Sequence, residues 1–236
     1  MSPRHSVTGR ALTRHALTAG AARPADRVGP PAAAGRRTLV LGGARSGKST
    51  EAERLLWHRR GVLYVATSGR RDGDAEWAER VRLHRERRPA GWATVETCDL
   101  EPLLAADGGP LLVDCLALWL TTVMDEAGAW DDGRWRSGPA RAEVAARVGG
   151  LVAGLRRTRR RVVLVSNEVG SGVVPATPAG RRFRDELGRL NAAVADACED
   201  VRLVVAGQVL PLRATGPAGR RGRGAAIPAP PPWGGR

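Results

Sequence analysis

The chain has 236 residues, of which 42% are apolar, 26% are charged and only 4% are aromatic. No apolar stretch approaches the roughly 20 residues that a transmembrane helix needs, so we predict no membrane span. The formal net charge of +14 is concentrated at the two ends, because residues 1–37 carry +6 and residues 213–236 carry +5. The basicity therefore says little about what the central residues bind, and we expect no nucleic-acid partner.

Both ends of the chain are rich in proline, glycine, alanine and arginine, a composition that buries little apolar surface. We predict a disordered basic extension at 1–37, a folded domain at 38–212 and a disordered tail at 213–236. The first segment is rich in arginine and poor in acids, as organelle transit peptides are, but a plain extension is favoured. Three cysteines without paired spacing, Cys98, Cys115 and Cys198, indicate reduced thiols in a cytoplasmic protein.

The first predicted strand, at 38–42, leads into a glycine-rich loop and then into a predicted helix at 49–60. The loop fits the pattern G-x-x-x-x-G-K-[ST] from Gly42 to Ser49, in the context of strand, loop and helix that a phosphate loop requires. Its backbone N–H groups and the helix N-terminus attract phosphate oxygens. Lys48 is the only lysine in the chain, and its compact ammonium reaches between phosphates as a planar guanidinium does not. We interpret the loop as a nucleoside triphosphate site and not as an ordinary glycine-rich turn.

Further short apolar runs follow along the chain, as strands buried on both faces of a sheet show. They lie at 61–68, 109–115, 160–167 and 200–207, with a weaker candidate at 92–96. Helical periodicity is clearest at 181–198 and is also present at 139–155. This alternation predicts an α/β fold with a mainly parallel sheet and helices on both faces.

Asp114 ends the apolar run at 109–115 and would project a carboxylate from the carboxyl edge of a buried strand. In phosphate-loop proteins such an aspartate helps to hold Mg²⁺, together with the loop hydroxyl, here that of Ser49. The alternative is that Asp114 caps the helix that follows it. A switch GTPase of the Ras type is excluded, because its guanine-reading loop needs a second lysine.

His84 lies among four arginines, Arg82, Arg85, Arg87 and Arg88, in the segment "RLHRERRPAGW". Neighbouring positive charge disfavours the imidazolium and is expected to lower the pKa of His84, which leaves a ring nitrogen free at neutral pH. A neutral imidazole beside phosphate-binding arginines is suited to attack phosphorus. The alternative is an ordinary surface histidine on an arginine-rich helix.

At these motifs the sequence closely resembles the bifunctional adenosylcobinamide kinase/adenosylcobinamide-phosphate guanylyltransferase family of cobalamin biosynthesis. The stretches that carry the resemblance are "GGARSGKS" (42–49), "VLYVATS" (62–68), "HRERRPAGW" (84–92) and "SNEVGSGVVP" (166–175), followed by "RFRDELGRLNAAVA" (182–195) and a closing strand "VRLVVAGQVLPL" (201–212). They cover nearly all of the chain between its two ends. Arg87 departs from the family pattern, where glycine is common.

The resemblance implies a RecA-type phosphate-loop fold, a homotrimer, and phosphorylation of adenosylcobinamide with ATP or GTP. It further implies transfer of GMP from GTP to adenosylcobinamide phosphate through a guanylyl-histidine, with Mg²⁺ as cofactor. The histidine of that intermediate corresponds to His84. The implied nucleotide-binding residues are Gly42, Gly43, Ala44, Arg45, Ser46, Gly47, Lys48, Ser49, Ala66, Thr67, Ser68, Arg85, Glu86, Arg87, Arg88, Glu96 and Asp114.

Two other functions stay open from the sequence. One is a small-molecule kinase of the same fold without nucleotidyl transfer, in which His84 is inert. The other is a nucleotide-dependent nucleic-acid-binding module that uses the basic ends, for which the low aromatic content is unfavourable. The loop that contains Glu168 is assigned to the active site, where Glu168 orients a hydroxyl or water or only shapes a turn.

Overall fold

The computed structural model describes residues 36–67 and 88–214. The strands in these residues are β1 (Arg37–Gly42), β2 (Leu63–Ala66), β3 (Ala93–Glu96), β4 (Leu111–Asp114), β5 (Val162–Asn167), β6 (Asp200–Val205) and β7 (Gln208–Arg213). The helices are α1 (Lys48–Leu56), α3 (Glu101–Ala105), α4 (Leu116–Glu126), α5 (Asp132–Ser137), α6 (Pro139–Arg157) and α7 (Pro178–Asp196). All six predicted strands are present. The division at 37/38 and 212/213 remains a prediction, because most of both ends lies outside the described residues.

The seven strands form one sheet in the order β3-β2-β4-β5-β1-β6-β7. Every neighbouring pair is parallel except β6 and β7. Along one edge, Gly42 at the end of β1 is level with Asn167 at the end of β5. Asp114 at the end of β4 is level with Ala66 of β2 and with Val165 of β5. The sheet thus gathers the carboxyl ends of four neighbouring strands at one edge, where α/β folds bind ligands.

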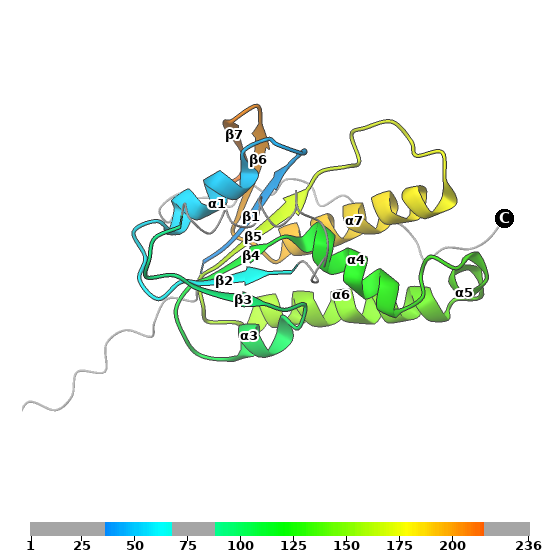
Figure 1. Cartoon of the computed structure of the whole chain (residues 1–236), viewed down its shortest axis with the longest axis horizontal. Helices are drawn as coiled ribbons and strands as arrows, with labels where there is room; N and C mark the ends of the chain where they lie inside the picture. The colour runs from blue at the N-terminus through cyan, green and yellow to red at the C-terminus, as the bar shows by residue number, and fades with distance from the viewer. Residues whose placement is uncertain (1–35, 68–87, 215–236) are drawn as a thin grey trace, which may run out of the picture. The chain divides into compact units, whose positions relative to one another are not determined.

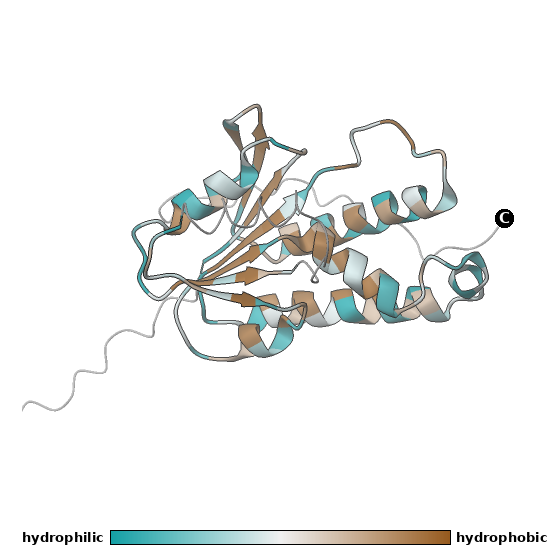
Figure 2. Cartoon of the chain, viewed as in Figure 1, coloured by the Kyte–Doolittle hydropathy of each residue, from teal (hydrophilic) through white to brown (hydrophobic). Residues whose placement is uncertain are grey.

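Helices cover both faces of the sheet, as predicted. Helix α1 contacts β1, β4, β5 and β6 on one face, whereas α6 packs against α3, α4 and α7 on the other (Figure 1). The apolar residues concentrate on the strands between these two layers (Figure 2). Strands β1 and β5 are buried along almost their whole length, which explains why each reads as a continuous apolar run.

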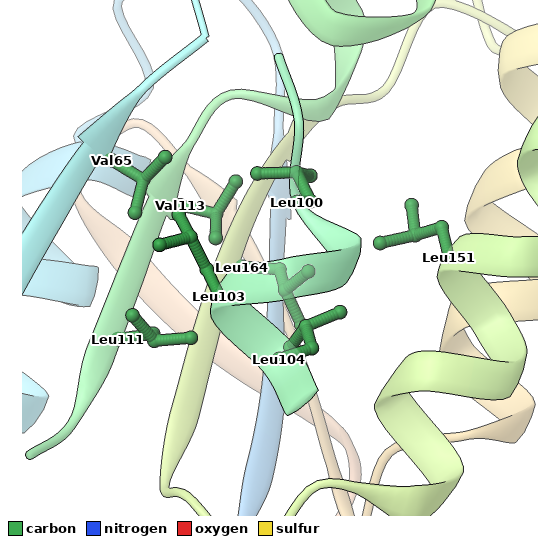
Figure 3. A pocket seen from close by; sticks show the side chains of 8 residues that line it. All are labelled: Val65, Leu100, Leu103, Leu104, Leu111, Val113, Leu151 and Leu164. Carbon is green, nitrogen blue, oxygen red and sulfur yellow. The ribbon is translucent and has the colours of Figure 1, made fainter. Parts of the chain in front are cut away.

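Leucines in and just before the short helix α3, together with Leu151 of α6, close the core over the middle of the sheet. Figure 3 shows Leu100, Leu103 and Leu104 directed toward strand residues such as Val113 and Leu164, with Leu151 opposite them. The space between these side chains does not admit a water molecule. This gap is therefore part of the packed core and not a binding site.

The chain ends in a hairpin, and the prediction of a single closing strand at 201–212 is wrong. A two-residue turn at Ala206 and Gly207, with φ of 50° and 77°, separates β6 from β7. Two consecutive residues with positive φ reverse a strand with the right-handed twist that hairpins need. Gln208 then pairs with Val205, and β7 runs back antiparallel along the edge of the sheet.

The residues at the ends of the helices are of types that favour helix ends. Thr177 accepts a hydrogen bond from the Gly180 N–H through its side chain at the start of α7, which spans 178–196 against the predicted 181–198. Helix α6 starts at Pro139, as predicted, because proline suits the first turn. Helix α1 is shorter than predicted and ends at Leu56. Among the residues that the structure describes, no helix combines the length and apolarity that a membrane crossing requires.

Candidate active site

The phosphate loop connects β1 to α1 and brings together all eight of its predicted residues, 42–49. Arg45 and Gly47 adopt left-handed backbone conformations, with φ of 56° and 96°. Gly47 precedes the first residue of α1, and its carbonyl accepts the Glu51 N–H at 3.0 Å. The loop therefore turns sharply onto the helix N-terminus, which leaves the first N–H groups of α1 outside the helical ladder.

Lys48 lies in the first turn of α1 and folds back over the loop. Its Nζ donates a hydrogen bond to the Gly43 carbonyl at 3.3 Å. The ammonium is therefore held across the concave side of the loop, where phosphate oxygens would meet it. This placement agrees with the role that the sequence predicts for the only lysine.

Backbone hydrogen bonds attach the loop to two other segments of the sheet edge. The Glu168 N–H donates to the Gly42 carbonyl at 3.1 Å, and the Gly207 N–H donates to the Ser46 carbonyl at 2.9 Å. The first bond joins the loop to the end of β5, and the second joins it to the β6–β7 turn. The phosphate loop is thus supported from both sides.

Asp114 ends β4, two strands from β1, so its carboxylate lies roughly 10 Å from the line of β1. The Tyr64 hydroxyl donates a hydrogen bond to Asp114 Oδ2 at 3.0 Å. Burial, and then the Asp114 carboxylate, raise the pKa of Tyr64 far above its usual range. Burial, and then the same carboxylate, raise the pKa of the Cys115 thiol to about 11, while the Lys48 ammonium opposes the shift.

The predicted metal ligands fit Mg²⁺ in chemistry. Ser49 in the first turn of α1 supplies a hydroxyl, and Asp114 supplies a carboxylate oxygen. No group of three or more acidic, histidine or cysteine side chains that could hold a metal occurs in the described residues. Mg²⁺ commonly takes one or two protein oxygens and completes its shell with water and substrate phosphates.

Two of the predicted nucleotide-binding residues, Ala66 and Thr67, lie at the carboxyl end of β2. Ala66 ends β2, next to Asp114. Thr67 is fully buried, and its hydroxyl donates to the Cys115 carbonyl at 2.6 Å. Its N–H donates to the Asp114 carbonyl at 3.3 Å and its carbonyl accepts from the Cys98 thiol at 3.2 Å, so Thr67 holds β2 to β4 and to the start of α4. Glu96 ends the neighbouring strand β3 and is level with Ala66. Ser68 lies outside the described residues.

Arg88 is the only member of the predicted arginine cluster that the structure describes, since His84, Arg85, Glu86 and Arg87 lie outside the described residues. Its guanidinium stacks over the Tyr64 ring, 3.2 Å from the centroid, and Nη1 donates to Thr94 Oγ1 at 3.2 Å. Only 6% of its side chain is exposed, and Nε lies 3.9 Å from Oε1 of the equally buried Glu53 of α1. Arg88 thus joins the end of the His84 segment to α1 and β2.

The loop between β5 and α7 borders the same edge and is anchored by a residue that sequence reasoning missed. Asn191, buried in α7, accepts from the Ser166 hydroxyl at 2.6 Å and donates to the Asn167 carbonyl at 3.0 Å. Its signal in the sequence is an amide on the apolar face of an amphipathic helix. Glu168 Oε1 accepts the Gly170 N–H at 2.6 Å, so its carboxylate shapes the turn at the start of the loop.

Past this turn the loop is open to solvent. Val173 is 94% exposed and Val174 is 61% exposed, and Figure 1 shows the segment as the arch between β5 and α7. Exposed adjacent valines at a ligand-binding edge are suited to contact an apolar part of a ligand. Tyr64 and Glu53 were also missed, because their contacts join residues far apart in the sequence.

Comparison with known proteins gives consistent matches. Residues 38–212 match the model of the protein family described as cobinamide kinase / cobinamide phosphate guanyltransferase. The bifunctional adenosylcobalamin biosynthesis protein CobP of Pseudomonas aeruginosa is 44% identical over 186 residues, which cover 75% of this chain and 97% of that protein. The corresponding CobU proteins of Escherichia coli and Salmonella typhimurium are 41% and 40% identical, each over 72% of this chain and 95% of the relative.

A solved structure of a type III secretion ATPase aligns with a TM-score of 0.41 and 11% identity, over 71% of this chain and 50% of that one. The RecA-type phosphate-loop fold itself is seen in the strand order, the loop after β1 and the placement of α1. The prediction of this fold is therefore confirmed.

Proposed function

We propose a function from the fact that the chain belongs to the cobinamide kinase and cobinamide phosphate guanyltransferase family. It is an enzyme of cobalamin biosynthesis with kinase and guanylyltransferase activities. The proposal is that it phosphorylates adenosylcobinamide with ATP or GTP and then transfers GMP from GTP to the new phosphate, which gives adenosylcobinamide-GDP. We also propose that it works in the cytoplasm as a homotrimer without a nucleic-acid partner.

In the kinase step, the phosphate loop holds the triphosphate while the oxygen of the substrate hydroxyl attacks the γ-phosphorus and its proton passes to water. A P–O bond to the substrate forms as the bond between the γ-phosphorus and the bridging oxygen breaks, and the nucleoside diphosphate leaves. Lys48 and the loop N–H groups neutralise the charge on the phosphates. Mg²⁺, held by Ser49 and Asp114, would supply further neutralisation of the triphosphate. The protein contributes mainly position, since phosphoryl transfer needs little covalent help.

In the guanylyl step, we assign the nucleophile to His84. A neutral ring nitrogen attacks the α-phosphorus of GTP, the N–P bond forms, and the bond to the β-phosphate breaks with release of pyrophosphate. A phosphate oxygen of adenosylcobinamide phosphate then attacks the same phosphorus, and the N–P bond breaks to release the histidine. Two displacements at one phosphorus replace a direct attack of one phosphate on another.

The observation that carries this proposal is the place of Arg88. The Arg88 side chain stacks on Tyr64, whose hydroxyl binds Asp114, so the segment that contains His84 ends beside the proposed site. His84 lies four positions before Arg88 in the chain, a stretch that spans at most about 14 Å when extended. His84 is therefore within reach of a nucleotide held by the phosphate loop.

The test is incubation of the protein with GTP labelled at the α-phosphate and Mg²⁺, without cobinamide. Label is expected on the wild-type protein through a bond that is labile to acid and stable to base, as a phosphoramidate is. His84→Asn should lose the label, whereas His58→Asn, which removes an exposed histidine after α1, should keep it. Label that persists in His84→Asn contradicts the assignment. Phosphorylation of adenosylcobinamide without any label supports the plain kinase.

A further inference from the structure

We propose that Tyr64, the only tyrosine of the chain, is a positioning residue that fixes the orientation of the Asp114 carboxylate for Mg²⁺-dependent nucleotide binding. The inference rests on the proposed function, because it takes Asp114 as the residue that holds the metal. It assigns a role to a residue that is not among the predicted catalytic, nucleotide-binding or metal-binding residues.

The register of the sheet places Tyr64 and Asp114 on the same face. Tyr64 is level with Leu112 on the neighbouring strand, and Asp114 follows Leu112 by two residues. Residues two apart on a strand share a face, and a diagonal cross-strand pair is within reach of an aromatic side chain. The length of the phenol ring spans this diagonal, and the hydroxyl meets Asp114 Oδ2 at 3.0 Å.

The Tyr64 ring is itself held rigidly. Only 4% of Tyr64 is exposed, and the Arg88 guanidinium covers one face of the ring at 3.2 Å from the centroid. Arg88 in turn donates to Thr94 on the neighbouring strand β3 and lies beside Glu53 of α1. A buried ring under a buried guanidinium has little freedom to rotate, so the hydroxyl stays directed at Asp114.

The rigid Tyr64 hydroxyl fixes the orientation of the Asp114 carboxylate. One oxygen, Oδ2, accepts the hydrogen bond that the Tyr64 hydroxyl donates, which fixes the carboxylate rotation and leaves Oδ1 to accept hydrogen bonds from metal-bound water. Hydrogen bonds that orient the side chains around a metal in this way typically contribute 10- to 100-fold to metal affinity. Without the hydroxyl, Asp114 keeps its charge but loses its fixed orientation.

A purely structural role is the competing explanation, because a buried tyrosine hydroxyl generally needs a partner. The two roles predict different things. A structural hydroxyl affects stability and affects nucleotide binding equally with and without Mg²⁺. A positioning hydroxyl affects binding only when Mg²⁺ is present.

The experiment is calorimetric titration of Tyr64→Phe with GTP, once with Mg²⁺ and once with EDTA. We expect the affinity for Mg²⁺-GTP to fall about tenfold, with the affinity in EDTA unchanged within about twofold. In an Asp114→Asn background, Tyr64→Phe should have no further effect on Mg²⁺-GTP affinity, since the oriented group is already altered. Thr158→Val is the matched control, because it removes another buried hydrogen bond, from the Arg160 N–H at 3.3 Å, in the connection between α6 and β5 at the opposite end of the strands from Asp114. It should lower stability and leave the effect of Mg²⁺ on GTP affinity as in the wild type.

Equal losses of affinity in Mg²⁺ and in EDTA, or no loss in either, would overturn the proposal, as would an additive effect in the Asp114→Asn background. The titration contains no cobinamide and does not depend on His84. A protein that binds Mg²⁺-GTP but forms neither product therefore contradicts the proposed function while this test of Tyr64 still gives its answer.

Discussion

A Cβ atom placed on Gly42 would lie 2.4 Å from Ser46 Oγ and 2.7 Å from the Val204 carbonyl oxygen. Gly42 ends β1, and Ser46 lies four residues later, on the far side of the phosphate loop. The loop therefore closes against its own first residue, with β6 directly behind it. Only glycine fits at position 42 without displacing the backbone of a neighbouring strand.

Gly42→Ala is accordingly expected to lower the free energy of unfolding by about 1–3 kcal/mol and to weaken GTP binding, since the added methyl group must push the loop outward. Denaturant unfolding and calorimetric titration measure the two effects. Gly43→Ala is the control for stability, because no atom lies within 4 Å of a Cβ at that position. A Gly42→Ala protein as stable as Gly43→Ala would show that the loop accommodates the methyl group.

Lys48→Arg is expected to reduce GTP affinity at least about tenfold. The ammonium is folded within 3.3 Å of the Gly43 carbonyl, and a guanidinium carries its donors on a larger planar group that does not fit the same point contact. Arg54→Lys, an exchange elsewhere on α1 at a residue paired with Glu51, should leave the affinity unchanged. Wild-type affinity in Lys48→Arg would mean that the site needs only positive charge.

Asn191→Leu should destabilise the protein by about 2–4 kcal/mol, because it leaves the buried Ser166 hydroxyl and the Asn167 carbonyl without their partner. The double variant with Ser166→Ala should lose less free energy of unfolding than the two single variants do together, since both members of one hydrogen bond are then absent. Asn191→Leu is also expected to raise the KM for adenosylcobinamide more than the KM for GTP, because it loosens the loop after β5. Simple additivity of the two stability losses would contradict the pairing.

The stability of the protein should fall as the pH rises above about 9. Burial, and then the Glu199 carboxylate, raise the pKa of the Cys198 thiol to about 12. An unfolded thiol titrates near 8.5, so between these values the unfolded state has released a proton that the folded state retains. A buried thiol such as that of Cys198 therefore lowers the free energy of unfolding by up to about 1.4 kcal/mol for each pH unit in this window.

Cys198→Ala removes this thiol, so the free energy of unfolding should fall less steeply with pH between pH 9 and pH 11. Below pH 8 the slopes of the two proteins should agree. Urea unfolding at each pH gives both values. Parallel curves throughout would show that Cys198 titrates normally in the folded state.

The parts of the fold that the sequence predicted correctly depend on short-range signals. Strands buried on both faces, such as β1 and β5, give continuous apolar runs, and the glycine pattern of 42–49 identifies its own loop. The helices α3 and α5 have five and six residues, too few for a helical period to be recognised. The β6–β7 turn escaped prediction because Ala206 stands where asparagine or glycine would be the usual signal.

The site was predicted only as a set of candidates, since their mutual contacts depend on the order of strands in the sheet. The pairing of Tyr64 with Asp114 joins residues 50 apart in the chain and follows from the neighbourhood of β2 and β4. Arg88 was predicted to bind nucleotide, and in the structure its guanidinium is occupied by the Tyr64 ring and Thr94. Residue type alone does not distinguish an arginine that meets phosphate from one that supports the residues around it.

The antiparallel course of β7 brings the chain back to the edge of the sheet at which β1 begins. Arg213 is level with Val201, which is level with Leu39, so the beginning of β1 and the end of β7 are two strands, or about 10 Å, apart. In a variant reduced to residues 37–213, a linker of a few residues would join these two strand ends, and new ends opened between α6 and β5 would emerge at the same edge. A circular permutant made in this way would leave the phosphate loop, at the opposite edge, uncut and attached to the same neighbours.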